Sequence, residues 1–318
     1  MPILRPAVLA AAALLLVAGC TGGGDPAADG DPTPSSSEAA GEVDPILRGL
    51  DVCALLPPAL AERASGVPVE PSSRRLTSLP GYAGVVDECR FGVSFGSSAV
   101  TLAVGLAPAT GADLRRVGGR PRAGVGGPAR TRVTPTDESV TFLRGATLVE
   151  LRSPVSADAP SRLARLVEVA RVLAEDVPAD PPESDEQTTG RCQDLSTDRV
   201  DGVLGSPAGL SRSLSYADGS AICSWATGVT RARTVTVAMY TNRQAGPFLA
   251  SQQDTGPSTP VRGVPGEAFT TPASAYVVAD DGQAVAINGS FARSRNGRPL
   301  PVTPELTALM RDAASAIR

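Results

Sequence analysis

Alternating hydrophobic and polar residues predict antiparallel strands along much of this chain. The segment Thr234–Tyr240 alternates with the two-residue period of a strand that buries one face. Two further segments flank Asp281-Gly282, a dipeptide that predicts a hairpin with a type I′ turn. These two segments are 275–279 and 284–287, and the other strands are expected at 90–95, 100–106, 140–143, 147–151 and 222–226.

Helical periodicity predicts two amphipathic helices, one near 163–174 and one near the C-terminus. The second helix has Thr303 as its N-cap and Pro304 at its first position. The expected apolar faces consist of Leu163, Leu166, Val167, Ala170, Leu173 and Ala174 in one helix, and of Leu306, Leu309, Met310, Ala313 and Ile317 in the other.

Shorter helices are expected after Cys53 and after Cys192, with Gly66 and Gly205 as their stops. Short helical pieces are also expected near 112–117 and 247–253. A variable polar loop should follow each of the first helices, and the next cysteine should begin a strand.

An internal repeat relates the two halves of the chain. An offset of 139 residues superimposes Cys53 on Cys192 and Leu56 on Leu195. It also superimposes Gly66 on Gly205, Gly124-Val125 on Gly263-Val264, Gly127 on Gly266 and Ala129 on Ala268.

The repeat and the element pattern predict an α+β protein with two tandem modules at 46–177 and 191–318. Each module is expected to be an antiparallel sheet covered by a short N-terminal helix and a C-terminal amphipathic helix. Between them, 178–190 is an acidic, proline-rich linker without apolar periodicity.

The first 19 residues have the pattern of a lipoprotein signal peptide. A weakly basic start precedes an apolar run that is too short to span a membrane, and the run ends in Val17-Ala18-Gly19-Cys20. This resembles a bacterial lipobox, so Cys20 is expected to be lipidated and 20–45 to be a flexible tether. The alternatives are a secreted protein with a free Cys20 and an uncleaved anchor.

Composition limits the chemistry that the chain can perform. The chain has no histidine, and all 29 basic residues are arginine. Arginine remains protonated and serves neither as a general base nor as a Schiff-base nucleophile. No catalytic motif occurs either, so we expect no enzyme and no cofactor. The net charge of -4 does not indicate a nucleic-acid partner.

Four cysteines remain beside Cys20, which outside the cytoplasm implies two disulfides with three possible pairings. The repeat favours Cys53–Cys89 and Cys192–Cys223, one inside each module. Metal binding is the alternative role for these cysteines, but there is no CxxC motif and no histidine to complete a tetrahedral site.

The cysteine motifs resemble those of actinobacterial cell-envelope lipoproteins that carry a cysteine-paired domain of unknown function, here in tandem duplicate. The family pattern Asp-Pro-Cys-x-Leu-Leu appears as Asp51-Val52-Cys53-Ala54-Leu55-Leu56, and Cys223-Ser224-Trp225 matches its Cys-x-Trp form. Cys89-Arg90-Phe91 departs from that form in the aromatic residue. The resemblance implies no catalytic residues.

Six arginines close together form a candidate anion-binding patch, for which a solvated glycine-rich loop is the alternative interpretation. Three acidic pairs are expected to lie at the surface, and Trp225 is expected in a core. The arginines are Arg115, Arg116, Arg120, Arg122, Arg130 and Arg132; the acidic pairs are Asp87-Glu88, Asp137-Glu138 and Asp280-Asp281.

These features together predict a lipid-anchored protein on the outer face of the cell membrane that binds an envelope protein, lipid or polymer without catalysis. A carboxylate-dependent hydrolase of envelope sugar or lipid is one alternative. A sensor or accessory subunit of a membrane complex is another.

Overall fold

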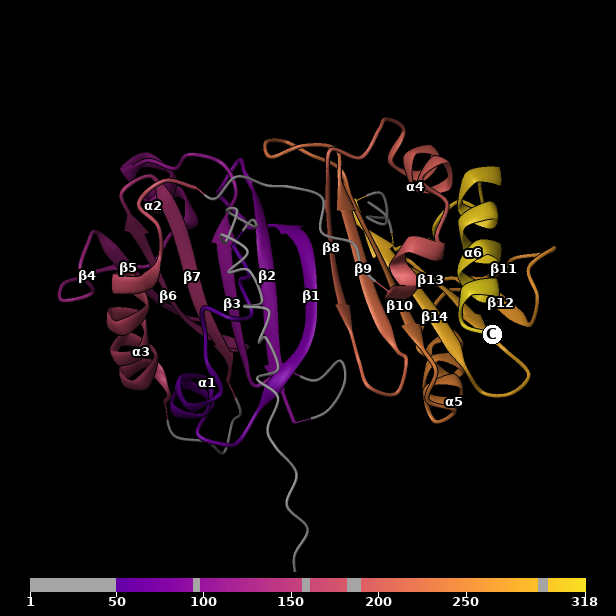
Figure 1. Ribbon diagram of the computed structural model, residues 1–318, viewed down its shortest axis with the longest axis horizontal. Coiled ribbons are helices and arrows are strands. Elements are labelled where there is room, and N and C mark those ends of the chain that lie inside the picture. Colours follow the sequence, from indigo (N-terminus) through magenta and orange to yellow (C-terminus); the bar gives the residue numbers. More distant parts are fainter. Residues whose placement is uncertain (1–49, 94–97, 156–160, 182–189, 291–296) are drawn as a thin grey trace, which may run out of the picture. The chain divides into compact units, whose positions relative to one another are not determined.

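The computed structural model describes residues 50–93, 98–155, 161–181, 190–290 and 297–318. The predicted signal peptide, Cys20, the tether and most of the linker lie outside these residues. The described residues belong to one compact unit that contains two antiparallel sheets (Figure 1). The architecture is α+β, as predicted.

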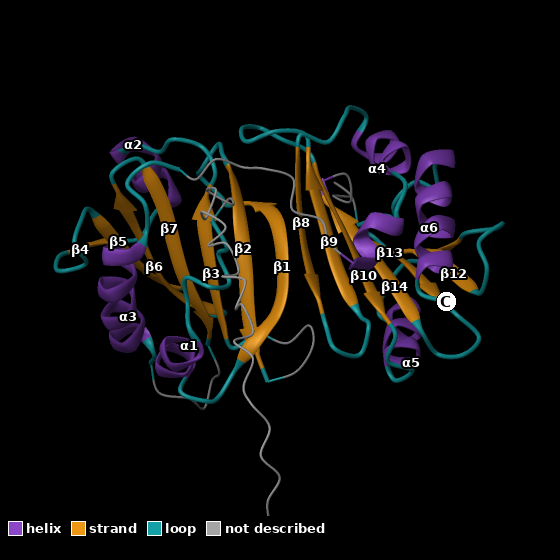
Figure 2. Cartoon of the chain, viewed as in Figure 1, coloured by secondary structure: helices purple, strands orange, loops and turns teal. Residues whose placement is uncertain are grey.

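The first sheet has seven strands in the order β1-β2-β3-β7-β6-β5-β4. Helices α1, α2 and α3 accompany it (Figure 2). Its elements are α1 (Pro58–Ser65), β1 (Glu70–Ser78), β2 (Val85–Gly92), β3 (Val100–Gly105), α2 (Gly111–Val117), β4 (Arg120–Arg122), β5 (Ala129–Val133), β6 (Asp137–Arg144), β7 (Thr147–Pro154) and α3 (Leu163–Asp176).

The second sheet has the order β8-β9-β10-β14-β13-β12-β11, which repeats the connectivity of the first sheet strand for strand. Its elements are η1 (Gly190–Asp194), α4 (Thr197–Leu204), β8 (Leu210–Ser215), β9 (Ala221–Ala226), β10 (Thr234–Tyr240), α5 (Ala245–Ala250), η2 (Ser251–Gln253), β11 (Thr259–Pro260), β12 (Glu267–Thr270), β13 (Ser274–Val278), β14 (Ala284–Gly289) and α6 (Pro304–Ala316).

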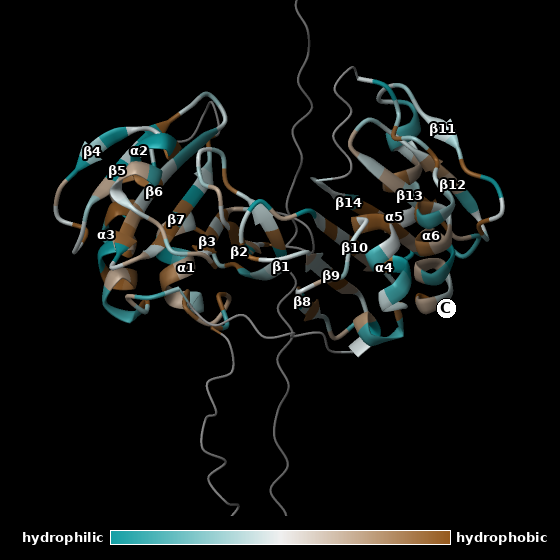
Figure 3. Ribbon diagram, turned by 90° about the horizontal axis from the view of Figure 1, so that it is seen from above, coloured by the Kyte–Doolittle hydropathy of each residue, from teal (hydrophilic) through white to brown (hydrophobic). Residues whose placement is uncertain are grey.

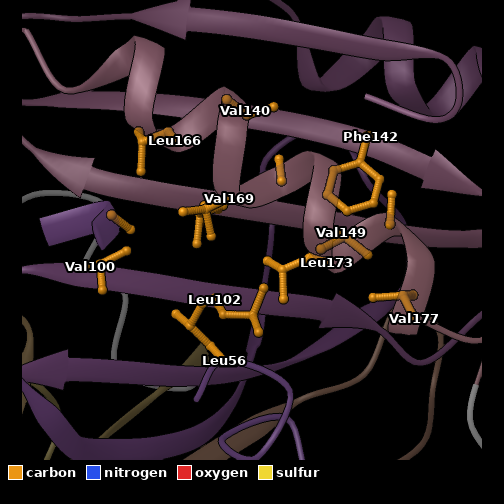
Figure 4. Packing of buried hydrophobic residues seen from close by; sticks show 14 of the residues in the cluster. Leu56, Val100, Leu102, Val140, Phe142, Val149, Leu166, Val169, Leu173 and Val177 are labelled. Carbon is orange, nitrogen blue, oxygen red and sulfur yellow. The ribbon is translucent and has the colours of Figure 1, made fainter. Parts of the chain in front are cut away.

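One face of each sheet packs its apolar residues against the long helix of its module, α3 or α6. In the first sheet, Leu102 and Phe142 pack with Leu166 and Leu173 of α3 and with Leu56, which precedes α1 (Figure 4). In the second sheet, Trp225 is buried in the corresponding core with residues of α4 and α6. Figure 3 shows hydrophobic residues, in brown, on the strands of both sheets and on helices α3 and α6.

Local signals place several element ends as expected. Gly66 and Gly205 end α1 and α4 in the left-handed conformation, with φ of 79° and 73°. The Thr303 side chain caps α6 by accepting a hydrogen bond from the Leu306 amide at 3.2 Å. Both predicted disulfides are present, Cys53–Cys89 and Cys192–Cys223.

Three local predictions are wrong. The variable polar loops after α1 and α4 contain strands β1 and β8. Cys89 and Cys223 were expected to begin a strand, but they lie within β2 and β9. The turn near Asp281 is not type I′, because only Gly282 has positive φ there, and its three-residue loop suits a type I turn with a glycine bulge.

Candidate functional site

A buried ion cluster joins the two sheets. The Asp87 carboxylate accepts hydrogen bonds from Arg74 Nη2 at 2.8 Å and from Arg212 Nε at 2.6 Å. Asp87 is fully buried, and both arginines are almost fully buried. Arg212 belongs to β8 in the second sheet, so the charge on Asp87 couples the two modules.

Further contacts extend this junction. The Leu76 amide of β1 donates a hydrogen bond to Ser224 Oγ of β9 at 2.9 Å. Leu76 also packs in an apolar cluster with Leu210 and Ala226 of the second sheet. Strand β1 is an edge strand of its sheet, so these contacts cover an edge that would otherwise be exposed.

A polar cleft of about 330 Å³ lies beside this junction, and we call it the inter-sheet cleft. Strand β1 forms one wall, and strands β10 and β14 with the start of β13 form the other. The lining residues are Arg75, Leu76, Thr77, Ser78, Thr234, Thr236, Ala273, Ser274, Asn288, Gly289 and Ser290.

The face of the first sheet opposite α3 carries a group of charges beside an apolar cluster that Leu114 and Val117 of α2 cover. Cross-strand register places Arg75 beside Glu88, and Arg90 and Arg152 lie on the same face. Glu88 Oε1 accepts from Arg75 Nε at 2.7 Å and from Arg90 Nε at 2.9 Å. Arg152 Nη2 lies 3.4 Å from Glu88 Oε2.

Glu150 is the second buried acid of this face. Its Oε2 accepts a hydrogen bond from Thr141 Oγ1 at 3.2 Å and lies 4.0 Å from Arg132 Nη2. Arg75, Arg90, Arg132 and Arg152 are each a quarter to a third exposed, above two almost fully buried glutamates. We call these four guanidiniums the arginine layer.

The pKa values of Glu88 and Glu150 are shifted in opposite directions because their surroundings differ. Burial would raise the pKa of Glu88, but Arg75, Arg90 and Arg152 outweigh it and lower that pKa. Burial raises the pKa of Glu150, and the arginines near it compensate only in part. Glu88 is therefore a firmly ionised centre, while Glu150 is a carboxyl that gains a proton more readily.

The arginines of the patch predicted from the sequence are spread over three elements, although Arg120 and Arg132 line one cleft of about 430 Å³. Arg116 pairs with Asp113, and Arg130 Nε donates to the Gly119 carbonyl at 3.0 Å. Arg132 belongs to the arginine layer. The remaining three, Arg115, Arg120 and Arg122, are exposed. The patch is not a loop, because it is built from α2, β4 and β5.

Two of the acidic pairs predicted at the surface are wholly or partly buried. Asp87, Glu88 and Glu138 are each less than 9% exposed, because arginines or backbone amides satisfy their oxygens. Only Asp280-Asp281 is exposed as a pair. Sequence reasoning missed the arginine layer because its members come from four strands.

A second cleft, of about 540 Å³, lies between α1 and the start of β1, and we call it the glutamate cleft. Exposed Glu62 and Glu70 line it together with Tyr216 of the second module. Burial raises the pKa of Tyr216, so its phenol stays protonated. The other lining residues are Pro58, Pro68, Val69, Pro71, Ser72, Gly92 and Val93.

The described ranges contain neither a cluster of metal ligands nor a membrane-spanning helix. No three histidine, cysteine, aspartate or glutamate side chains there are grouped to hold a metal ion. No described helix has the length and apolar character needed to cross a bilayer. Comparison with protein-family models, with curated proteins and with solved structures found no match.

Proposed function

We propose that this protein is a lipid-anchored lipoprotein on the outer face of the cell membrane, where it binds an envelope component without catalysis. The lipobox-like Val17-Ala18-Gly19-Cys20 supports the anchor. Two intramodular disulfides are typical of an oxidising compartment outside the cytoplasm. The resemblance to actinobacterial envelope lipoproteins agrees with both.

The inter-sheet cleft is the observation that supports a binding role most strongly. Its walls come from both modules, and the buried Asp87 cluster beside it joins the sheets. A preformed polar cleft, with one charged side chain among its described lining residues, suits recognition, since positioned polar groups fix a ligand's orientation.

Metabolic labelling tests the anchor. Cells that express the full chain are grown with a radiolabelled fatty acid, and the protein is then isolated from the membrane fraction. We expect label in the wild type and none in a Cys20→Ala variant, with Ser35→Ala as a control that keeps the label. An unlabelled wild type, or label that persists in Cys20→Ala, would contradict the anchor.

The glutamate cleft supports a second candidate, a carboxylate-dependent hydrolase of envelope sugar or lipid. Glu62 and Glu70 line one cleft, and most glycoside hydrolases use two carboxyl groups as their catalytic groups. If this candidate is correct, the purified lipoprotein should release reducing ends or fatty acids from isolated envelopes. Glu62→Gln and Glu70→Gln should each abolish that release, and an inactive wild type would exclude the candidate.

A further inference from the structure

The inter-sheet cleft and the arginine layer share one residue, Arg75. Its Nε donates a hydrogen bond to Glu88 Oε1 at 2.7 Å, whereas its two terminal nitrogens have no hydrogen-bond partner among the described residues. The side chain is about a quarter exposed and lines the cleft. The hydrogen bond to Glu88 therefore positions the guanidinium, and its two terminal N–H groups remain available to donate to a ligand.

The charge around Arg75 favours an anion. Arg75 is the single charged residue among the described residues that line the cleft, and no carboxylate is among them. On the adjoining sheet face, four partly exposed arginines cover two buried glutamates, so the exposed charge is positive. A guanidinium binds phosphate or carboxylate through two parallel charge-assisted hydrogen bonds.

The opposite wall offers neutral hydrogen-bonding groups in a row. Cross-strand register places Thr236, Asn288 and Ser274 side by side on three adjacent strands. The Asn288 side-chain amide has no hydrogen-bond partner within the described part of the chain, and the Thr77 hydroxyl on the facing wall has none either. Such groups suit a ligand that carries several hydroxyls.

The size and polarity of the cleft narrow the class of ligand further. A volume of about 330 Å³ is at the small end of ligand sites, and none of the described residues that line it is aromatic. Nucleobases and acyl chains are usually bound against aromatic or extended apolar surfaces, and this lining provides neither.

We propose that the inter-sheet cleft binds an anionic sugar, whose phosphate or carboxylate pairs with Arg75 and whose hydroxyls bond to Asn288 and Thr77. This inference deepens the proposed function by naming the class of envelope component that is bound. Phosphorylated sugars and uronic acids share the necessary chemistry, and the experiment below distinguishes them.

Isothermal titration of the full-length lipoprotein in detergent micelles tests the proposal with three probes: glucose 1-phosphate, glucuronate and glucose. We expect at least one anionic probe to bind, and neutral glucose to bind at least tenfold more weakly. Arg75→Gln should weaken the anionic probe about tenfold or more, and Asn288→Ala about threefold. Arg144→Gln, at an exposed arginine outside the clefts, should leave binding unchanged.

The outcomes separate the possibilities. Binding of glucose 1-phosphate alone assigns a phosphorylated sugar, and binding of glucuronate alone assigns a uronic acid. Equal binding of glucose, no binding of any probe, or undiminished affinity in both Arg75→Gln and Asn288→Ala variants that keep the wild-type melting temperature would overturn the proposal. None of these results bears on fatty-acid labelling, so the anchor and the ligand class fail independently.

Discussion

The two sheets have the same strand order, but their faces opposite the long helices α3 and α6 differ at most equivalent positions. When the sheets are aligned on Cys89 and Cys223, Glu88 of the first corresponds to Ile222 of the second. The same register matches Arg75 with Leu214, Glu150 with Ala286, Thr141 with Tyr276, Arg130 with Phe269, Arg90 with Ser224 and Arg152 with Asn288.

This comparison shows which part of the fold the repeat preserves. The strand order and the helix-facing cores are retained because each sheet must bury one apolar face. The opposite faces have diverged in part. Helices α2 and α5 each cover an apolar cluster there, but beside this cluster the first sheet has arginines over buried glutamates, where the second sheet has apolar and neutral residues. A neutral row of the second sheet and the charged edge of the first then meet in the inter-sheet cleft.

The largest expected effect comes from the charge that joins the sheets. Asp87→Asn removes the buried carboxylate that Arg74 and Arg212 share, although Arg74 also lies 3.4 Å from the exposed Asp51. We expect a loss of about 4 kcal/mol in the free energy of unfolding, measured by urea denaturation at pH 7. Asp280→Asn, at an exposed acid, is the control. A loss below about 1 kcal/mol would mean that the cluster does not hold the sheets together.

A substitution that transfers a charge between the faces tests their divergence. Ile222→Glu places a carboxylate at the position equivalent to Glu88, where the surrounding cluster is apolar. We expect it to destabilise the protein by about 3 kcal/mol, because no arginine occupies the neighbouring equivalent positions. Ile222→Val should cost about 1 kcal/mol. Equal losses in the two variants would show that the second face also accepts charge.

Substitution of Glu88 and of Glu150 by glutamine is expected to have different effects on the free energy of unfolding. Glu88→Gln should cost about 2 kcal/mol at pH 7, because three arginines lose their shared partner. Glu150→Gln should be neutral or stabilising at pH 7, because burial raises the pKa of Glu150 and makes its ionised form costly. Urea denaturation across pH 3 to 8 measures both.

The sign of each pH dependence follows from the direction of the pKa shift. The contribution of Glu88, whose folded pKa is lowered, is present above the unfolded value of about 4.3 and is lost as the pH falls through the folded pKa. Glu150 has a raised folded pKa, so it stabilises the folded protein fully only when the pH is below the unfolded pKa of about 4.3. This contribution is lost as the pH rises through the folded pKa. Parallel profiles for the two variants would contradict this assignment.

The smallest expected effect compares the terminal helices of the two modules. Helix α6 has a side-chain N-cap, Thr303, whereas the N-cap of α3, Arg162, makes no side-chain cap bond. Thr303→Ala should lower the free energy of unfolding by about 1 kcal/mol, while Thr303→Ser keeps the hydroxyl and should remain close to wild type. Thermal denaturation followed by circular dichroism detects the difference. An unchanged Thr303→Ala variant would show that packing alone fixes α6.

Sequence patterns identified elements whose burial occurs within one module. Strands β3 and β10 were predicted from apolar residues that lie in the cores of their own sheets. Strands β1 and β8 were missed because their polar residues are buried by tertiary pairing: Arg74 pairs with Asp87 of its own sheet, and Arg212 pairs with Asp87 across the two modules. The paired acid Asp87 looked like a surface residue for the same reason.

The sequence by itself determined the α+β class, the duplication, the cysteine pairing and the helix ends, because these follow from local spacing and from apolar periodicity. Only the tertiary structure decided where the charges lie. The arginine layer draws on β1, β2, β5 and β7, and the inter-sheet cleft has walls from both modules. Cross-strand register and packing between the modules bring these residues together, and neither leaves a periodic signal in the chain.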